Sequence, residues 1–368
     1  MKRITMLAVG MLPPPLGGQA LMFERAIEAL REQYDLTVIN SQLQSNLGES
    51  GKFSAMKLIH FFRLLLCKII PLLVHTKFDI LFYCISGPSN FGLIKDLIFL
   101  VPLRARARKT VFYLYGAGGI TFLMQQNALM RAWARLVLFE PDLVLRPPYR
   151  SNEAALCRAK HEIVINNGIE DPIGMLSRKV QSWPDGELRF TFIGLLTEEK
   201  GVSDLVEIAR LLRDKNYRFT LSIVGEGLPA EISRLNELIA RYNLSDFVQL
   251  TGVLMGVDKF RLLQQTTVFL FPSYFPAETQ TTVLTEALAV NVPVVAYDWG
   301  GINTIIDQGV NGYLVCVRDK EGFCRAIEQI LANDNIDRMR VAARRIFLDR
   351  FTLSKHVEAL RQAFRSIE

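Results

Sequence analysis

The sequence is poor in the residues that usually build a metal site or a disulfide-stabilised fold. Its five cysteines stand at positions 67, 84, 157, 316 and 324 and include no C-x-x-C pair. This scatter argues against a zinc site or a disulfide framework and fits a reducing cytosol. The four histidines have no H-E-x-x-H or other metal-ligand spacing. We therefore expect no tightly bound metal and no cofactor.

Acidic residues are fewer than basic ones, which points to an acidic partner. The 37 Asp and Glu against 43 Lys and Arg give a net charge of +6, with an isoelectric point near 9.0. Nucleic acid, anionic lipid and phosphorylated small molecules all fit such a charge. No recognition helix, zinc-finger spacing or RNP-like aromatic motif is present. Nucleic acid is therefore not an expected partner.

The most apolar segment, Ala55–Val74, is interrupted and does not have the form of a bilayer-spanning helix, which takes about 20 apolar residues. Lys57, His60 and Lys68 fall on one side at helical periodicity, and Pro71 breaks the far end. Two alternatives stay open. The segment is either a helix lying in a membrane interface or a core-facing helix with a narrow polar stripe.

A second basic cluster comprises Arg104, Arg106, Arg108 and Lys109, just before a predicted strand. Such a run is typical of a solvated face, and it can also attract anionic lipid or a pyrophosphate.

The N-terminus has some features of a signal peptide. Lys2 and Arg3 precede an apolar run over 4–12, but three prolines and Gly17-Gly18 follow, and then a helical pattern begins near Ala20. A buried strand, a tight loop and a helix explain this order better.

Short apolar runs alternate with amphipathic stretches along the whole chain, which is the pattern of βα units and a parallel sheet. The length of 368 residues predicts about two domains. Predicted strands cover 4–9, 36–39, 80–83, 110–114, 143–145 and 163–165, then 189–193, 219–224, 248–250, 268–271, 293–296 and 312–315. We predict domains at 1–170 and 189–352, a Pro- and Gly-containing linker at 171–188, and a final helical segment at 353–368.

The segment 271–314 carries the most specific chemistry. A predicted strand ends at Phe271, a loop follows with Glu278, and a helix beginning near Thr281 bears Glu286. The first N–H groups of such a helix suit a phosphate, while carboxylates accept hydrogen bonds from vicinal hydroxyls. Either glutamate alone would be commonplace, but together they predict a nucleotide-sugar site at the carboxyl edge of the sheet.

This segment resembles the donor-binding motif of family-4 glycosyltransferases (glycosyl transferases group 1), which are retaining enzymes with the GT-B fold. The matches in order are Pro272-Ser273, Glu278, Glu286-Ala287, Pro293-Val294-Val295-Ala296, Gly300-Gly301 and Asn311-Gly312. Further matches in the second half are Phe192-Ile193-Gly194, Lys200-Gly201, Gly225-Glu226-Gly227 and Thr251-Gly252. The resemblance is weaker but in order before about Arg189, where Gly17-Gly18 and Asn167-Gly168 match.

The resemblance implies a role for each matching residue. Glu278 would bind sugar hydroxyls near the reacting carbon, and Lys200 would neutralise the diphosphate leaving group; these two are the implied catalytic residues. The implied donor-binding residues are Glu286 on the ribose, Thr281, Thr282, Val283, Gly194, Gly17, Gly18, Gly252 and Val253.

Three positions depart from the family pattern. Leu195 stands where many relatives carry arginine, and Thr279 where they carry glycine. Tyr115 stands where many carry a histidine, so Tyr115 and the following Gly116 are the acceptor-side candidates.

The resemblance implies two Rossmann-like α/β domains with parallel sheets facing across a cleft, the donor on the second and the acceptor on the first, and a last helix packing back on the first. The implied reaction moves a hexose-type sugar from a nucleotide-sugar to a glycan or lipid-pyrophosphate-linked acceptor in bacterial cell-surface polysaccharide assembly. We expect a cytoplasmic protein that can lie on the anionic inner face of the cell membrane.

Two alternatives stay open. Leu195 and Tyr115 leave room for a catalytically silent nucleotide-sugar-binding subunit, and a sugar-nucleotide epimerase shares the fold, although histidine is scarce. A dehydrogenase is disfavoured because no G-x-G-x-x-G follows the first strand.

Overall fold

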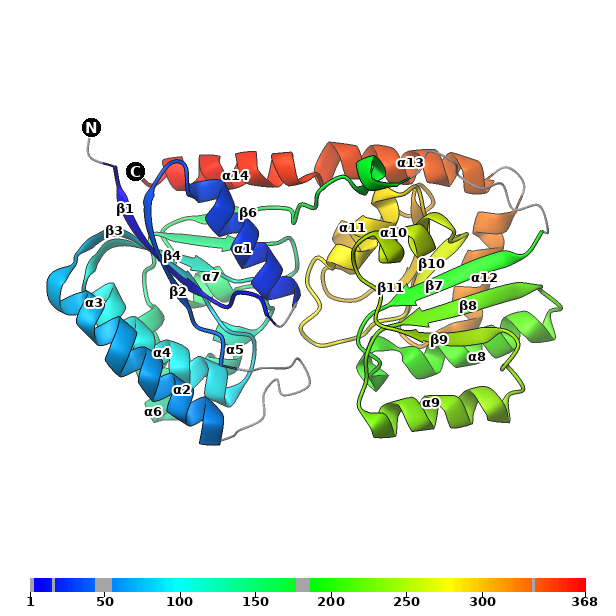
Figure 1. The fold of residues 1–368 in the computed structure, drawn as a ribbon, viewed down its shortest axis with the longest axis horizontal. Helices are drawn as coiled ribbons and strands as arrows, with labels where there is room; N and C mark the ends of the chain where they lie inside the picture. Colours follow the sequence, from blue (N-terminus) through cyan, green and yellow to red (C-terminus); the bar gives the residue numbers. More distant parts are fainter. Residues whose placement is uncertain (1–2, 15–16, 44–54, 177–185, 333–334) are drawn as a thin grey trace. The chain divides into compact units, whose positions relative to one another are not determined.

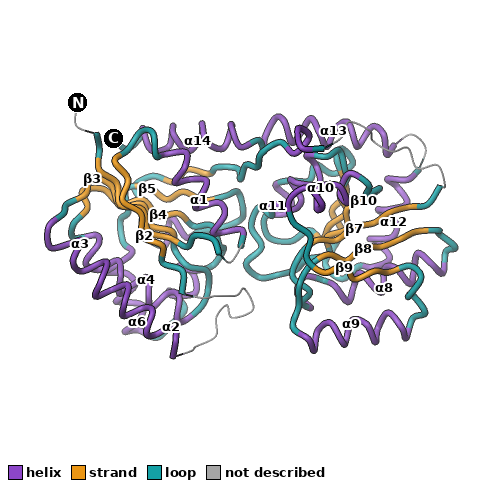
Figure 2. The backbone as a smooth tube through the Cα atoms, viewed as in Figure 1, coloured by secondary structure: helices purple, strands orange, loops and turns teal. Residues whose placement is uncertain are grey.

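The computed structural model describes residues 3–14, 17–43, 55–176, 186–332 and 335–368. The chain forms two compact units, which are Met1–Asn167 with His356–Glu368 (unit 1) and Gly168–Lys355 (unit 2). Each unit is built on one six-stranded parallel sheet with helices on both faces (Figures 1 and 2). The predicted α/β class, with two Rossmann-like parallel sheets, is confirmed.

The sheet of unit 1 has the strand order β2-β1-β3-β4-β5-β6. β1 lies between β2 and β3, so that Val9 pairs with both Ile39 and Tyr83. The strands are β1 Thr5–Gly10, β2 Asp35–Asn40, β3 Phe78–Cys84, β4 Ala107–Tyr113, β5 Leu143–Arg146 and β6 Glu162–Val164.

Helices cover both faces of this sheet. One face packs against α1 and α14, and the other against a layer made of α2, the π-helical turn η2, α3, α4, α5 and α6 (Figure 1). Leu360 and Phe364 of α14 belong to the core on the α1 face. The helices are α1 Gly18–Leu30, α2 Ala55–Leu64, η2 Leu65–Ile69, α3 Ile70–His75, α4 Asn90–Arg104, α5 Gly119–Met124, α6 Ala128–Leu138, α7 Glu153–Leu156 and α14 Leu353–Arg365.

The sheet of unit 2 has the order β12-β11-β10-β7-β8-β9. Its strands are β7 Leu188–Ile193, β8 Phe219–Val224, β9 Val248–Gly252, β10 Val268–Phe271, β11 Val294–Tyr297 and β12 Gly312–Val315. Its helices are η3 Pro172–Met175, η4 Glu198–Lys200, α8 Val202–Asp214, α9 Pro229–Arg241, α10 Gly256–Gln264, α11 Thr282–Ala289, η5 Ile302–Thr304, α12 Lys320–Leu331 and α13 Asn335–Arg350.

Each of the twelve strands predicted from the sequence overlaps an observed strand. The first apolar run forms β1, and α1 begins at Gly18, which confirms the predicted strand–loop–helix order. Of the predicted linker, 177–185 lies outside the described residues, and Pro172–Met175 forms a 3-10 turn.

The apolar segment after residue 55 differs from one of its two predicted forms. Lys57 is only 5% exposed, whereas Met56 beside it is 73% exposed, and Ile59, Phe62 and Leu66 are exposed as well. Phe61, Leu64 and Ile69 face the core. The predicted core-facing helix is therefore confirmed on its inner side, whereas the predicted polar stripe is wrong for Lys57, and much of the outward side is apolar. Within the described ranges, no helix is both long and apolar enough to cross a bilayer.

Candidate functional site

The loop between β10 and α11 places Glu278 in a buried, fully hydrogen-bonded position. Its side chain is 7% exposed. Lys200 Nζ donates to Glu278 Oε2 at 2.6 Å, and the Ser273 hydroxyl donates to the same oxygen at 2.6 Å. The Thr281 hydroxyl donates to Oε1 at 2.7 Å. Three predicted site residues, Lys200, Glu278 and Thr281, are thus brought into one cluster.

Two close backbone approaches explain why these loops meet. A Cβ atom on Gly201, which has φ of +75°, would lie 2.0 Å from the carbonyl oxygen of Pro272. A Cβ on Gly300, at φ of +56°, would lie 2.3 Å from the carbonyl oxygen of Glu278. Only glycine fits such positions without a shift of the backbone. Gly201 therefore allows the turn that carries Lys200 to lie against the loop after β10. Gly300 likewise allows its own loop to pack against the backbone of Glu278.

Aromatic rings complete the surroundings of Lys200. Its Nζ lies 4.7 Å from the ring centroid of Phe275 and 5.8 Å from that of Phe271. A partly desolvated ammonium is stabilised by such ring faces as well as by its carboxylate partner. The charge of Lys200 is therefore held in one place by Glu278 and two rings.

Glu286 has a partner that sequence reasoning missed. Lys259 Nζ, from α10, donates to Glu286 Oε1 on α11 at 2.7 Å, and both side chains are largely buried. The sequence held one signal for this partner. A lysine in the first turn of a helix interacts unfavourably with the helix dipole, so its presence there suggests that it pairs with an acidic group. The donor-site candidates thus include two buried or partly buried ion pairs rather than two separate carboxylates.

The start of α11 is the place where the sequence predicts an anion site. Thr281 precedes the helix, and Thr282 and Val283 are its first residues. Their backbone N–H groups have no carbonyl one turn earlier in the helix to bond to, so they can serve a phosphate oxygen. This end of α11 directly follows the Glu278 cluster in the chain.

The remaining predicted residues of unit 2 lie on the same carboxyl edge but outside that cluster. Gly194 follows β7, and its N–H donates to the carbonyl of Val224 at 3.0 Å. Leu195, next to it, is exposed. Gly252 ends β9, which is three strands from β10, and Val253 after it is exposed.

In unit 1 the structure brings together Gly18 and Tyr115, which the sequence separates widely. Gly17 precedes α1, and a Cβ on Gly18 would lie 3.1 Å from the Tyr115 hydroxyl oxygen. Tyr115 is largely buried after β4, and Gly116 lies so close to Gly87 that a Cβ would be 3.4 Å from its Cα. The Tyr115 hydroxyl therefore faces the N-terminal end of α1, where the helix dipole is positive.

A buried carboxylate, Glu153, holds the loop that follows Tyr115. This side chain is 2% exposed. It accepts hydrogen bonds from the backbone N–H groups of Ile120 at 2.7 Å, Gly118 at 3.2 Å and Thr121 at 3.3 Å. The Tyr149 hydroxyl donates to it at 3.0 Å, and burial, followed by the charge of Glu153, raises the pKa of Tyr149. Sequence reasoning missed Glu153, which lies in a short helix with no motif around it.

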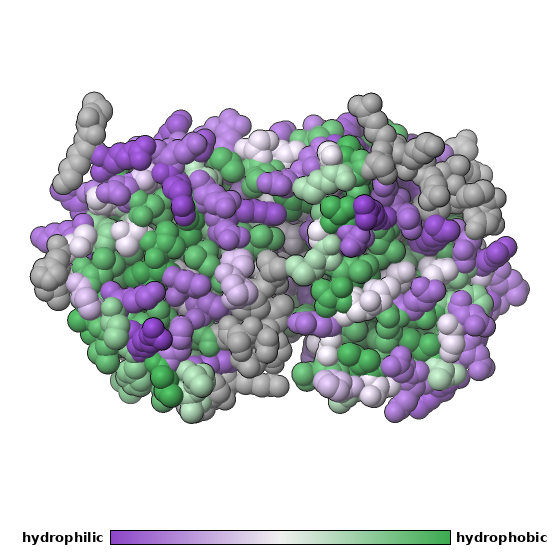
Figure 3. Space-filling model, viewed as in Figure 1, coloured by the Kyte–Doolittle hydropathy of each residue, from purple (hydrophilic) through white to green (hydrophobic). Residues whose placement is uncertain are grey.

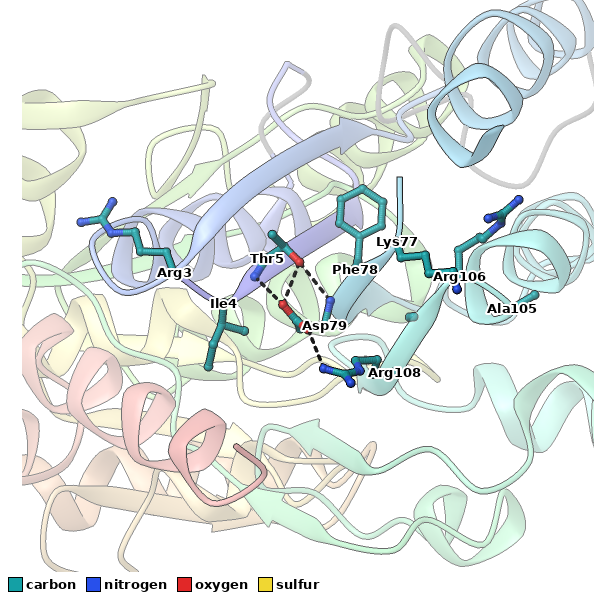
Figure 4. A pocket seen from close by; sticks show the side chains of 10 residues that line it. Arg3, Ile4, Thr5, Lys77, Phe78, Asp79, Ala105, Arg106 and Arg108 are labelled. Atoms are coloured by element: carbon teal, nitrogen blue, oxygen red, sulfur yellow. Dashed lines mark hydrogen bonds and ion pairs between the residues drawn. The ribbon is translucent and has the colours of Figure 1, made fainter. Parts of the chain in front are cut away.

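The basic cluster predicted at 104–109 does not act as a unit. Arg104 donates to the carbonyl of Val137 at 2.6 Å, and Lys109 to the carbonyl of Ile367. Arg106 and Arg108 instead line a pocket at the amino ends of β1, β3 and β4, together with Arg3 and Lys77 (Figure 4).

Asp79 is the acid of this pocket. It accepts from the Thr5 backbone N–H and hydroxyl, and with Arg108 these bonds lower its pKa. The pocket lies at the edge of the sheet opposite to Gly18 and Tyr115 and contains none of the predicted site residues.

No metal-ligand cluster occurs in the described parts of the chain, taken as three or more His, Cys, Asp or Glu side chains. His356 is buried, with its Nδ1 2.7 Å from the carbonyl oxygen of Asn166. Burial lowers its pKa.

The Lys200–Glu278 pair lies beside the N-terminus of α11 at the carboxyl edge of the sheet of unit 2, which is the edge where ligands bind in open α/β sheets. Residues 176–347 match the family model of glycosyl transferases group 1. This stretch contains Lys200, Lys259, Glu278 and Glu286, and therefore both ion pairs.

Named relatives agree with that match. The amylovoran biosynthesis glycosyltransferase AmsK of Erwinia amylovora is 32% identical over 180 residues, which are 48% of this chain and 42% of AmsK. The putative colanic acid biosynthesis glycosyltransferase WcaL of Escherichia coli K12 is 33% identical over 40% of this chain and 36% of WcaL. The chain thus matches about two fifths of the length of these curated relatives. The family match and the relatives support a transferase enzyme of the glycosyltransferase class.

Among solved structures, Anabaena HepE in complex with UDP and glucose is similar to this chain with a TM-score of 0.73 and 17% identity, over 98% of this chain and 100% of HepE. This likeness shows that the fold is GT-B.

Proposed function

We propose that the protein is a retaining, family-4 glycosyltransferase that moves a hexose-type sugar from a nucleotide-sugar to a glycan or lipid-pyrophosphate-linked acceptor. The observation that carries the proposal is the Lys200–Glu278 pair, with Nζ and Oε2 2.6 Å apart, at the start of α11. The names of AmsK and WcaL support a role in bacterial cell-surface polysaccharide assembly, and UDP in HepE supports a nucleotide-sugar donor.

The proposed chemistry divides the work among these groups. The bond between the anomeric carbon and the diphosphate breaks, and negative charge builds on the departing phosphate. An acceptor hydroxyl oxygen forms the new bond to the anomeric carbon, and the proton of that hydroxyl passes to the departing phosphate. Lys200 and the N–H groups of Thr282 and Val283 stabilise that charge, because they are fixed before the reaction begins. Glu278 accepts hydrogen bonds from sugar hydroxyls, and Glu286 accepts from the ribose. We propose that these groups neutralise the leaving group without a tightly bound metal.

In the proposed complex, the donor adds hydrogen-bond partners to both glutamates. In the free protein Glu278 and Glu286 are occupied by Lys200 and Lys259. A bound donor offers hydroxyls to the carboxylates and phosphate oxygens to Lys200, so the lysine stands between two negative groups in the complex. A carboxylate accepts several hydrogen bonds at once, and therefore Glu278 can keep Lys200 while it binds the sugar.

The acceptor side is assigned to unit 1. Tyr115 and Gly116 are the proposed contacts, with Tyr115 in the place that a histidine occupies in relatives. We propose that the protein works in the cytoplasm, where its acceptor is held at the inner face of the membrane.

The decisive experiment is calorimetric titration of the purified protein with a panel of nucleotide-sugars, followed by NMR of the product formed with a lipid-pyrophosphate-linked acceptor. Transfer with the anomeric configuration kept is the expected result. Tight donor binding without transfer would identify a silent binding subunit, and conversion of the nucleotide-sugar into its epimer would identify an epimerase. No binding of any nucleotide-sugar would overturn the proposal.

A further inference from the structure

The helical layer of unit 1 that includes α2 and α6 carries an unusual concentration of exposed apolar side chains. Nine of the 21 exposed large apolar residues in the described chain lie on α2, η2, α3, α4 and α6. We call six of them, Met56, Ile59, Phe62, Leu66, Leu129 and Leu136, the outer apolar surface. Figure 3 shows apolar atoms gathered along the lower margin of unit 1, where Figure 1 draws these helices.

The two ends of this surface belong to one layer. α4 contacts both η2 and α6, and side chains from α2, η2, α4 and α6 share one core cluster against the sheet. In α4 itself only Asn90 and Val101 are exposed. The flanking segments α2–η2 and α6 therefore present their outward faces on the same side of the sheet.

The exposure is too high for ordinary surface scatter. Leu129 is 83% exposed and Leu136 81%, seven residues apart on one face of α6. On the other segment, Met56, Ile59 and Leu66 follow helical spacing as well. A helix that is apolar on nearly all sides is normally buried, and contiguous exposed apolar patches mark interaction sites.

The charges on the same helices identify the partner. Residues 55–75 and 128–138 contain no Asp or Glu, and the one acid of α4, Asp96, is buried against Lys95 and Tyr83. In contrast, Arg63, Lys68, Arg131 and Arg135 are exposed beside the apolar residues. A surface that combines apolar side chains with charges of only positive sign is complementary to an anionic bilayer, in which acyl chains lie below phosphate groups.

We propose that the outer apolar surface docks on an anionic phospholipid bilayer, with the leucines and Phe62 entering the interface and the four basic side chains reaching the headgroups. Long basic side chains can extend to phosphates while their stems stay in apolar surroundings. This proposal rests on the proposed function and deepens it. If the outer apolar surface lies on the membrane, then unit 1, to which we assign acceptor binding, is the unit that contacts the membrane in which a lipid-linked acceptor is held. It explains why α2 and α6 expose their leucines and phenylalanine instead of covering them.

Sedimentation with vesicles of phosphatidylglycerol and phosphatidylethanolamine tests this directly. The parent protein should bind them, release at high salt because screening removes the basic contribution, and bind pure phosphatidylcholine much more weakly. Leu129→Ser with Leu136→Ser should lower the vesicle partition by about tenfold or more. Arg131→Gln with Arg135→Gln should lower it by about tenfold at low salt, and by much less at high salt.

Matched controls keep the outcome clear. Val341→Ser changes a residue that is 68% exposed on α13 of unit 2, and Arg241→Gln changes an exposed arginine of α9; neither should alter vesicle binding. Nucleotide binding by calorimetry should be the same in all variants, so failure of this proposal and failure of the proposed function are separable. Parent protein that ignores vesicles, or leucine variants that bind like the parent, overturns the proposal. A parent that self-associates through this surface, with monomeric leucine variants, also overturns it in favour of a second copy as the partner.

Discussion

The candidate sites of the two units consist of different kinds of residue. In unit 2 the site consists of charges that neutralise each other, Lys200 with Glu278 and Lys259 with Glu286. In unit 1 it consists of a tyrosine hydroxyl beside a helix N-terminus, with a buried glutamate holding the next loop. A donor has the same diphosphate whatever its sugar, so fixed charges suit it. The proposed acceptor reacts through a sugar hydroxyl, which carries no charge, so the contacts near that hydroxyl can be neutral.

The largest expected effect falls on the charged site. Lys200→Ala should cost about 2–4 kcal/mol of transition-state stabilisation, because one preorganised group at the leaving group is lost and Leu195 offers no substitute. Steady-state transfer rates measure the effect. Lys215→Ala, which breaks an exposed ion pair with Glu328, is the matched control and should leave the rate unchanged.

Loss of Lys200 also leaves the buried carboxylate of Glu278 without its cation, so stability must be measured beside activity. The double variant Lys200→Met with Glu278→Gln removes both charges and should recover the melting temperature without recovering turnover. A Lys200→Ala protein that keeps half of its rate contradicts the assignment.

The two glutamates of unit 2 should respond differently. Glu286→Ala should weaken binding of the free nucleoside diphosphate by about 1.5–3 kcal/mol, as for lost hydrogen bonds to a charged group. Glu278→Gln keeps the shape and should leave that affinity nearly intact while turnover falls. Calorimetry beside transfer rates separates the cases, and equal losses of affinity in both would mean that the roles are misassigned.

In unit 1 the largest loss of stability should come from substitution of Glu153, which is not a proposed ligand contact. Glu153→Ala leaves three backbone N–H groups and the Tyr149 hydroxyl without their acceptor, at a cost of about 1–3 kcal/mol in the free energy of unfolding. Glu153→Gln keeps one carbonyl oxygen and should cost less. Donor affinity should stay at the parent value while the acceptor KM rises, because the loop after Tyr115 loses its support. A change in donor affinity instead would contradict the division of work between the units.

The smallest expected effect is a pH dependence of the stability of unit 1. Burial lowers the pKa of His356, whereas the unfolded chain takes up this proton below about pH 6.5. The free energy of unfolding should therefore decrease as pH falls below that value, by at most about 1.4 kcal/mol per pH unit. Urea titrations of the parent and of His356→Gln should differ in this slope, and the exposed His161→Gln should behave like the parent.

The same contrast between the units governs what could be predicted from sequence. All twelve strands were predictable, because buried parallel strands leave short apolar runs. Lys200, Glu278 and Thr281 were predictable as one site because they lie on motifs of the second half. The role of Glu153 was not predictable, since the backbone N–H group of Ile120 that it holds lies 33 residues away and only the folded chain brings them together. The place of Lys259 near the start of a helix was a signal, but its partner Glu286 lies 27 residues away and could not be named from it. The outward face of α2 was not predicted either, because the helical periodicity of Lys57, His60 and Lys68 indicated a polar side, whereas Lys57 is buried and Met56 and Ile59 are exposed.

The division of unit 1 into two stretches of sequence has a consequence for how the chain matures. Unit 2 is continuous from Gly168 to Lys355, but unit 1 needs Met1–Asn167 and the later His356–Glu368. Because synthesis proceeds from the N-terminus, domains generally fold in the order in which they emerge. The first stretch of unit 1 therefore cannot complete its core while unit 2 is being synthesised. During that time the sheet face that Leu360 and Phe364 cover in the folded protein is still exposed. Unit 2 should thus be the first to reach its native state on the ribosome, although it is encoded second.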